Sequence, residues 1–517
     1  MSPRLKVGRA NAVSLTGLEG HMVRVEGLIQ DGLPGFTLVG LPDAALGEAR
    51  DRVRAAFASA GFAFPQTRVT VNLSPAYLPK CGTGFDLAIA AALLTATRRV
   101  DPAAGQNTVL IGELSLDGRI RPVRGVLPAV AAAVAAGYSD VVVPAACQRE
   151  AALVAGANPL GIESLEELAW RWGAGIEPPP PDRCASIAAG LGAAPEPVEY
   201  PDLADVVGQA QARYALEVAA AGGHHILMQG PPGTGKTMLA ARLPGLLPQL
   251  DEAQAVEVTA LHSVAGTFNP DRGLITRPPF QDPHHTATPA ALVGGGSGIP
   301  RPGAASLAHR GVLFLDECPE FSPRALQTLR QPLERGEVVI HRANGAARYP
   351  ARFHLVLAAN PCPCGRGWGR GEQCSCTATA KRRYMGRLSG PLLDRIDLVV
   401  DVDPVAELPL GQGPAGESSA AVAARVAAAR AEQRRRYAEF GWLTNAEVPG
   451  TWLRGRLGAG SAIHRQLNQA LEMGLLSMRG VDRVLRVAWT MADLAGFDSP
   501  TPDQVDQAIC LRVRAAI

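Results

Sequence analysis

The sequence predicts an α/β fold, in which a nucleotide-binding core with a helical lid follows a separate α+β domain. Three observations indicate this organisation. A glycine-rich loop joins a short apolar strand to a helix near the middle of the chain. A second apolar strand, about 80 residues further on, ends in two acidic residues. From residue 419 to the end, the patterns are helical.

The glycine-rich loop fits the phosphate-binding pattern G-x-x-x-x-G-K-[ST]. Its residues are Gly230-Pro231-Pro232-Gly233-Thr234-Gly235-Lys236-Thr237, between an apolar run at 225–229 and a helical pattern at 238–247. Glycines let backbone N–H groups surround phosphate oxygens without a Cβ clash, and the helix N-terminus adds positive charge. We expect Lys236 to contact the β/γ phosphates of ATP and Thr237 to bind Mg²⁺.

The acidic pair is Asp316-Glu317, which follows the apolar strand at 311–315. This arrangement is typical of a Walker B element. Asp316 is expected to organise Mg²⁺ through its water shell, and Glu317 to polarise the attacking water. A buried strand ending in two solvated acids would look the same in isolation, but the P-loop upstream favours the catalytic interpretation.

Composition limits the class of protein. The chain has 517 residues, a net charge of +2 and nine cysteines. Any nucleic-acid binding must therefore come from local patches rather than from the overall charge. The longest apolar run, 126–136, is too short to span a bilayer, and the N-terminus lacks the apolar segment of a signal peptide. We expect a soluble cytoplasmic protein without membrane contact.

The domain boundaries follow from composition. Residues 1–172 read as a self-sufficient domain with strands at 22–28, 37–39, 68–72, 108–113 and 140–143 and helices at 44–60, 85–95 and 126–136. A proline-rich linker at 173–199 and a Pro/Gly-rich linker at 401–418 enclose the core at 200–400. The lid at 419–517 is expected to hold helices at 420–437, 463–473, 479–495 and 502–513.

Two segments of the core carry further signals. Runs at 338–342 and 347–349 flank Asn344-Gly345, which predicts a β-hairpin with basic residues His341, Arg342 and Arg348. His284 and His285 invite a metal interpretation, but side chains at adjacent positions are expected to diverge. A structural or pore-loop role is therefore preferred for the two histidines.

Four cysteines, Cys362, Cys364, Cys374 and Cys376, lie within a loop rich in Gly and Arg. Four thiolates can surround a tetrahedral Zn²⁺ at about 2.3 Å each. The alternative is four reduced thiols in a flexible loop. The same region holds Arg366, Trp368, Arg370 and Lys381-Arg382-Arg383. Basic residues beside an aromatic ring suit DNA phosphates and bases, which makes this the strongest local nucleic-acid signal in the chain; a solvated loop is the alternative.

The first domain resembles the Lon-protease-like domain, with an S5-type fold, of magnesium-chelatase-like ATPases. The stretches that carry the resemblance are 33–36, 39–43, 71–75 and 112–118. Lon proteases use a Ser–Lys dyad, but Gly84 and Leu127 stand at the two matching positions. Because neither nucleophile nor base is present, we expect no proteolysis and no protease substrate. The resemblance implies a binding or assembly domain.

The order of all these motifs resembles the ComM/YifB family of magnesium-chelatase-like AAA+ ATPases. The resemblance implies a homo-hexameric ring that hydrolyses ATP at subunit interfaces and moves DNA in recombination or natural transformation, as a branch-migration helicase. By the same resemblance, Asn360 is the sensor 1 residue that contacts the γ-phosphate or the lytic water. A hairpin such as 338–349 points into the central pore in some AAA+ motors, and an ordinary surface hairpin is the alternative.

The resemblance also assigns two arginine roles. The stretch 389–397 resembles an arginine-finger motif, in which Arg395 would reach the γ-phosphate of a neighbouring subunit; an Arg–Asp surface pair is the alternative. Arg479, or else Arg483, would be the sensor 2 arginine of the lid. Two other functions compete with a DNA motor: the ATPase subunit of a metal chelatase that inserts Mg²⁺ into a porphyrin, and a non-enzymatic scaffold. The intact motifs argue against the scaffold.

Overall fold

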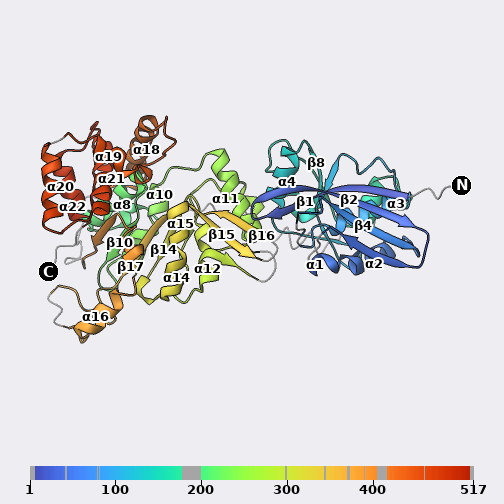
Figure 1. The fold of residues 1–517 in the computed structure, drawn as a ribbon, viewed down its shortest axis with the longest axis horizontal. Coiled ribbons are helices and arrows are strands. Elements are labelled where there is room, and N and C mark those ends of the chain that lie inside the picture. Colours follow the sequence, from blue (N-terminus) through green and yellow to red (C-terminus); the bar gives the residue numbers. More distant parts are fainter. Residues whose placement is uncertain are drawn as a thin grey trace.

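The computed structural model has an N-terminal domain and a P-loop core with its lid, which lie side by side (Figure 1). The residues that it describes are 6–40, 44–78, 80, 82–176, 200–296, 300–342, 345–369, 373–388, 390–404, 416–458 and 460–512. Much of the sequence-predicted linkers falls outside these ranges, including the prolines 178–181. So do Asn344 of the predicted hairpin turn, Arg370, Ser389 and residues 41–43 and 513.

A seven-stranded sheet organises the N-terminal domain, in the order β3-β4-β2-β1-β5-β8-β9. Neighbours among β4, β2 and β1 run antiparallel, and the other pairs run parallel. Its strands are β1 (Lys6–Thr16), β2 (Glu19–Gln30), β3 (Gly35–Val39), β4 (Arg68–Ser74), β5 (Thr108–Leu110), β8 (Asp140–Pro144) and β9 (Asn158–Ile162). The short strands β6 (Glu113–Leu114) and β7 (Ile120–Arg121) form a separate pair.

Helices cover this sheet, and the most buried of them packs across its centre. Every residue of α3 (Asp86–Ala96) is buried, which explains its almost wholly apolar sequence. The other helices are α1 (Ala44–Gly47), α2 (Ala49–Ser59), α4 (Val126–Ala135), α5 (Gln148–Ala151) and α6 (Leu165–Arg171). The predicted elements are present, but the sequence did not predict β1, because its buried positions are small residues such as Ala10 and Ala12.

The P-loop core is built on five parallel strands in the order β11-β14-β17-β10-β18. They are β10 (Ile226–Gln229), β11 (Phe280–Gln281), β14 (Val312–Leu315), β17 (His354–Ala359) and β18 (Leu398–Asp401). β10, β14 and β17 are apolar and almost wholly buried, as strands covered on both faces must be. Because all five strands point the same way, the residues that follow them meet at one edge of the sheet.

Many short helices surround the core sheet. They are α8 (Ala210–Gly222), α9 (Lys236–Ala240), α10 (Leu243–Leu246), α11 (Glu252–Ala265), α12 (Pro289–Val293), α13 (Ala304–Leu307), α14 (Pro323–Thr328), α15 (Arg330–Arg335), α16 (Ala378–Met385) and α17 (Gly390–Leu393). The helix expected at 238–247 is interrupted between α9 and α10, where Pro244 occupies the first turn of the second helix. Two small hairpins complete the core: β12 (Gly294–Gly295) with β13 (Arg301–Pro302), and β15 (Glu337–Arg342) with β16 (Gly345–Pro350).

The lid is helical, as predicted. Its helices are α18 (Ser419–Arg436), α19 (Gly450–Gly455), α20 (Ala462–Glu472), α21 (Met478–Ala495) and α22 (Pro502–Cys510). Thr501 and Gln504 form a capping box at the start of α22, in line with the Thr-Pro-Asp sequence there. Side chains of α18 and α21 share one hydrophobic core with α8 and β10. The lid is therefore packed directly on the P-loop side of the sheet.

The N-terminal domain packs on the core through α11 and the β15–β16 hairpin. Leu15 and Leu18, at the β1–β2 turn, pack against a buried cluster that includes Val264 of α11 and Tyr349 of β16. Gly17, with a φ of 68°, lies so close to the Arg348 carbonyl that a Cβ would collide with it. The hairpin is thus present as predicted, and one of its strands is covered by the chain's own N-terminal domain.

No helix in the described parts of the chain combines the length and apolar character needed to cross a membrane.

Candidate active site

The P-loop lies at the carboxyl end of β10, a central strand of the core sheet. Gly233 and Gly235 have left-handed backbone angles, with φ of 79° and 90°, which glycine adopts without strain. The backbone of Gly230 touches the Val402 carbonyl so closely that no side chain fits there. The glycine spacing read from the sequence therefore corresponds to a backbone path that other residues would disturb.

Lys236 begins α9 and turns back over the loop. Its Nζ donates to the carbonyls of Gly230 and Pro231, at 2.8 Å each, and lies 3.3 Å from Oδ1 of Asn360. Burial lowers the pKa of Lys236, while the charges of Asp316 and Glu317 oppose that shift. The carbonyl oxygens that hold the Lys236 ammonium are neutral acceptors. A phosphate oxygen is charged and accepts more strongly, so it can replace them.

The proposed magnesium ligands already touch one another. Oγ1 of Thr237 donates to Oδ2 of Asp316 at 2.6 Å, which joins the P-loop helix to the end of β14. A hydroxyl and a carboxylate are hard oxygen donors, the type that Mg²⁺ prefers. These two side chains therefore fit Mg²⁺ bound between the P-loop and the Walker B strand.

Glu317 has an unusual backbone and an unexpected neighbour. Its φ is 47°, a left-handed value, and its N–H donates to Oδ1 of Asp316 at 2.8 Å. Oε2 of Glu317 lies 3.5 Å from Nδ1 of His285, which follows the short strand β11. Half of the Glu317 side chain remains exposed, so its carboxylate can reach solvent.

The expectation that the two histidines diverge is wrong. Their ring centroids are 4.1 Å apart, because the chain turns after β11 and Nδ1 of His284 bonds Oγ1 of Thr286 at 2.8 Å. Sequence reasoning also missed the position of His285 beside Glu317. Only the order of strands, with β11 next to β14, brings these two residues together.

Arg395 lies between α17 and β18. Its guanidinium pairs with Glu334 of α15 and donates to the carbonyl of Pro391. Within its own chain, Arg395 thus pairs with a glutamate distant in sequence and not with one of the flanking aspartates. The role of Arg395 at a neighbouring subunit's nucleotide remains a prediction.

The two candidate lid arginines differ in environment. Arg479 is 83% exposed and its Nη1 is 3.7 Å from Oδ2 of Asp394. Arg483 is largely buried, pairs with Asp397 and donates to the carbonyl of Arg395 at 3.1 Å. Arg483 therefore has a structural role in joining lid to core, and Arg479 is the arginine whose side chain is free to meet a ligand.

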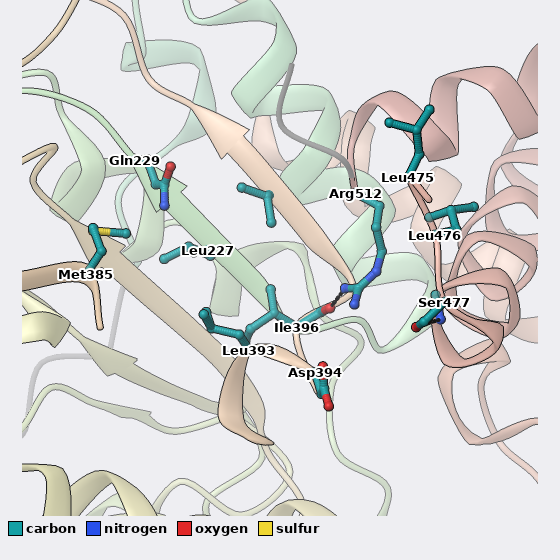
Figure 2. A pocket seen from close by; sticks show the side chains of 12 residues that line it. Leu227, Gln229, Met385, Leu393, Asp394, Ile396, Leu475, Leu476, Ser477 and Arg512 are labelled. Atoms are coloured by element: carbon teal, nitrogen blue, oxygen red, sulfur yellow. Dashed lines mark hydrogen bonds between the residues drawn. The ribbon is translucent and has the colours of Figure 1, made fainter. Parts of the chain in front are cut away.

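A cavity of about 350 Å³ separates the core from the lid beside these residues. Figure 2 shows Gln229 at one end and Leu475, Leu476 and Ser477 of the lid at the other, with Arg512 reaching the carbonyl of Ile396. Gln229 directly precedes the P-loop, and Ser477 caps α21, the helix of Arg479. The cavity thus lies between the lid and the end of β10 that leads into the P-loop.

The structure also brings Cys362, Cys364, Cys374 and Cys376 together in the loop between β17 and α16. The exposed Arg366 lies in the same loop, and exposed Arg382 and Arg383 lie on α16. Trp368 is half-buried, and its indole N–H donates to Oδ1 of Asp403 at 2.8 Å.

A parallel sheet with a P-loop, a Walker B pair, a polar residue after the adjacent strand and a helical lid defines an AAA+ P-loop NTPase. Comparison with known proteins agrees. The family described as magnesium chelatase, subunit ChlI, matches residues 202–409, its C-terminal part matches 416–512, and subunit ChlI of Mg-chelatase matches 25–147.

Relatives match nearly the whole length. An uncharacterized protein of Mycobacterium tuberculosis is 54% identical over 99% of this chain and 100% of its own. The uncharacterized protein YifB of Escherichia coli is 40% identical over 96% and 95%. Competence protein ComM of Haemophilus influenzae is 40% identical over 93% and 92%. The chain therefore belongs to the magnesium-chelatase-like family that includes YifB and ComM.

These comparisons confirm the predicted fold class of an AAA+ core with a preceding domain. A shorter similarity to Lon protease 2 of Bacillus subtilis, 33% identical over 29% of this chain, is consistent with the Lon-like resemblance. Family membership implies the use of ATP and Mg²⁺.

Proposed function

We propose that this protein is a Mg²⁺-dependent ATPase that assembles into a homo-hexameric ring and moves DNA, acting in recombination or natural transformation. The observation that carries the ATPase part is the contact of Thr237 with Asp316 at 2.6 Å, beside Lys236 and Asn360. These four residues come from three separate segments, yet they converge where Mg²⁺ and the β/γ phosphates of ATP would lie. Glu317 stands next to them as the residue that polarises water.

The proposal of a ring rests on the need for an arginine from a second copy of the chain in each active site. Hydrolysis in P-loop NTPases is strongly accelerated by an arginine that neutralises transition-state charge. We assign that role to Arg395 of a neighbouring copy. In its own chain the side chain of Arg395 is 19% exposed and pairs with Glu334, whose side chain is half-exposed. Two copies are then required for each complete site, and closure of such contacts generates a ring.

The DNA part rests on surface charge and on a relative. Helix α16 extends from the lower edge of the core in Figure 1 and carries the exposed Arg382 and Arg383. Arginine side chains on a projecting helix suit phosphate contacts, which depend on charge rather than on sequence. A relative of nearly equal length is named a competence protein, which favours a substrate of this type in cytoplasmic DNA metabolism.

ATP turnover with and without DNA tests both parts. Lys236→Ala and Glu317→Gln should abolish turnover, and full activity in either variant would refute the site. Single-stranded, forked and four-way DNA should each be assayed for stimulation. Arg382→Ala/Arg383→Ala should reduce stimulation severalfold and leave the basal rate unchanged. Arg435→Ala is the matched control, because Arg435 is an exposed arginine of α18 that pairs with Glu432.

A second candidate function is the motor subunit of a magnesium-chelatase-type complex, which the family match at 202–409 favours. Metal insertion into a porphyrin, assayed with the same preparation after addition of the other subunits of a magnesium chelatase, distinguishes the two. Stimulation by DNA without metal insertion supports the DNA motor. Metal insertion without any DNA effect would replace it by the chelatase function.

A further inference from the structure

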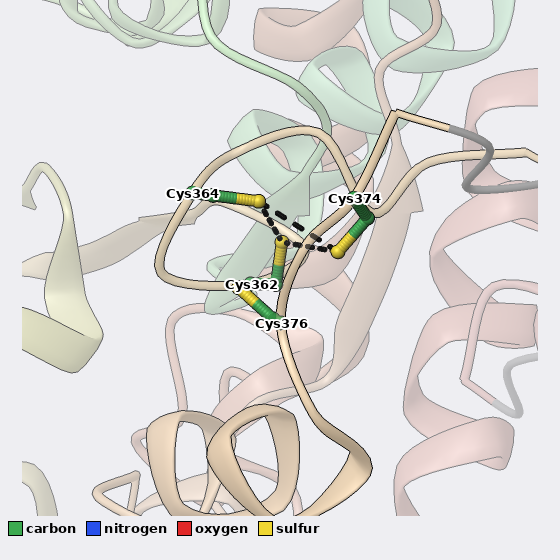
Figure 3. A group of neighbouring side chains, drawn as sticks. All are labelled: Cys362, Cys364, Cys374 and Cys376. Atoms are coloured by element: carbon green, nitrogen blue, oxygen red, sulfur yellow. Dashed lines mark hydrogen bonds between the residues drawn. The ribbon is translucent and has the colours of Figure 1, made fainter.

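Four cysteine side chains converge in the loop that leads from β17 to α16 (Figure 3). Sγ of Cys362 lies 3.3 Å from Sγ of Cys364 and 3.6 Å from Sγ of Cys374. Sγ of Cys364 is 3.6 Å from Sγ of Cys374, and all four sulfur atoms, including that of Cys376, lie within 4.8 Å of one another. Among the described residues, this is the one group of three or more such side chains arranged to hold a metal ion.

We propose that Cys362, Cys364, Cys374 and Cys376 bind one Zn²⁺ ion as a tetrathiolate site. Four Zn–S bonds of about 2.3 Å in a tetrahedron place the sulfur atoms about 3.8 Å apart, close to the separations in this loop. A disulfide needs about 2.05 Å between sulfur atoms, so no pair here is bonded. The short span of the group fits a single ion, since sulfur ligands of a polynuclear iron–sulfur cluster surround a larger volume.

The spacing of one residue between the paired cysteines is compatible with this site. Pro363 separates Cys362 from Cys364, and its ring fixes one backbone angle between them. The two thiols nevertheless lie on the same side of the chain, as their 3.3 Å separation shows. Gly367 passes Cys362 so closely that a Cβ would lie 2.9 Å from Sγ, which leaves room only for backbone beside the sulfur atoms.

The zinc loop, of which the structure describes residues 361–369 and 373–377, is in contact with the nucleotide site. The backbone of Gly365 packs on the ring of Pro232 in the P-loop, where a Cβ would lie 2.5 Å from Cγ. The hydrogen bond from Trp368 ties the loop to Asp403. The carbonyl of Asp403 in turn accepts from Nε2 of Gln209 at 2.6 Å.

The polypeptide itself also links the cysteine group to the nucleotide site. Cys362 is two residues after Asn360, which contacts Lys236. A metal that holds Cys362 and Cys364 in place therefore restrains the residues that follow β17. It also restrains Gly365, which packs on Pro232. We infer that Zn²⁺ positions the P-loop and Asn360 for ATP without touching the nucleotide. Its loss should weaken nucleotide binding by about tenfold.

Metal content of the full chain tests the site directly, without nucleic acid or turnover. Protein purified without chelator should contain one equivalent of zinc by elemental mass spectrometry, and Cys362→Ser and Cys374→Ser should each lose it. Cys510→Ser is the matched control, because Cys510 is an exposed thiol on α22, away from the loop, and this variant should keep its zinc. Protein without zinc, or with iron in its place, would overturn the proposal.

A second measurement does not depend on the folding of variants. Progressive thiol modification of the wild-type chain should release one zinc per chain to a colorimetric chelator. Replacement by Co²⁺ should give the strong near-ultraviolet charge-transfer absorption of four thiolates. Binding of a fluorescent ATP analogue to the metal-depleted chain measures the positioning role. Unchanged affinity after complete zinc loss would refute that role, and failure of DNA stimulation alone would leave the zinc site standing.

Discussion

Nδ1 of His285 lies 3.5 Å from Oε2 of Glu317, so a residue after the edge strand β11 touches the carboxylate expected to polarise the lytic water. The contacts of the His285 ring are with Glu317 and with the ring of His284. It can therefore influence hydrolysis by orienting Glu317 rather than by binding nucleotide.

We expect His285→Ala to lower kcat about tenfold and to leave the KM for ATP within about twofold, because only the orientation of Glu317 is disturbed. Steady-state ATPase assays separate the two constants. His341→Ala is the control, since His341 is an exposed histidine of the β15–β16 hairpin, whereas the ring of His284 contacts His285 itself. A basal rate that rises in His285→Ala would show that the contact restrains Glu317.

Thr237→Val should shift the Mg²⁺ concentration for half-maximal ATPase upward by tenfold or more. The substitution keeps the shape of the side chain but removes the hydroxyl that bonds Asp316, and with it one hard ligand of the metal. Thr237→Ser retains the hydroxyl and should behave like the parent chain. Equal Mg²⁺ dependence of all three proteins would exclude Thr237 as a ligand.

Arg395→Ala should bind ATP normally and lose at least a hundredfold in turnover, as expected for an arginine that acts on a neighbouring site. Mixtures of two inactive variants test action between subunits more directly. Lys236→Ala is also inactive, yet its Arg395 is intact, so mixtures with Arg395→Ala should recover part of the activity at shared interfaces. Recovery that is absent at every ratio contradicts action between subunits. Glu334→Gln controls for loss of the in-chain pair.

Arg479→Ala and Arg483→Ala should have opposite profiles. Arg479 is exposed and weakly paired, so its loss should lower turnover and leave thermal stability nearly unchanged. Arg483 pairs with the buried Asp397. Burial alone would raise the pKa of Asp397, but the charge of Arg483 acts together with His224 and His225 to outweigh it, and the net pKa is lowered. Removing Arg483 should therefore destabilise the fold by about 3–5 kcal/mol. Calorimetry and ATPase assays distinguish the two.

The free energy of unfolding should fall between pH 6.5 and pH 4. Burial lowers the pKa of His225 to about 4, and its Nδ1 accepts the N–H of Leu355 at 3.1 Å. The unfolded chain, with a histidine pKa near 6.5, binds this proton at a pH where the folded chain does not. Stability is thus complete above about pH 6.5 and declines on acidification, by about 2 kcal/mol at pH 5 for this residue.

Thermal melts across this range measure the effect. His225→Asn should flatten the dependence on pH, although it also lowers stability at neutral pH through the altered packing. His341→Asn replaces an exposed histidine of the hairpin and should leave the slope unchanged. An identical slope in all three proteins would show that other groups control the acid response.

Elements whose structure depends on residues close together in the sequence could be predicted. Asp316 and Asn360 each stand directly after an apolar run, and Lys236 ends the glycine-rich loop that follows another such run, so these strands and the polar residues after them could be predicted. The contact between His285 and Glu317 could not be predicted, because β11 has two residues, too few for a strand pattern. The convergence of the cysteines was only a possibility in the sequence, since spacing alone does not show where a loop folds back.

The packing of Leu15 and Leu18 against α11 and the hairpin could not be predicted either, because these residues lie on opposite sides of a linker in the sequence. It means that residues 177–199 are not the sole tether between the two bodies. Ion pairing of Arg149 with Asp271 adds to the same surface. A protease that cuts within 177–199 should therefore yield two fragments that still elute together, and separate expression of the two pieces should reconstitute the chain from its halves.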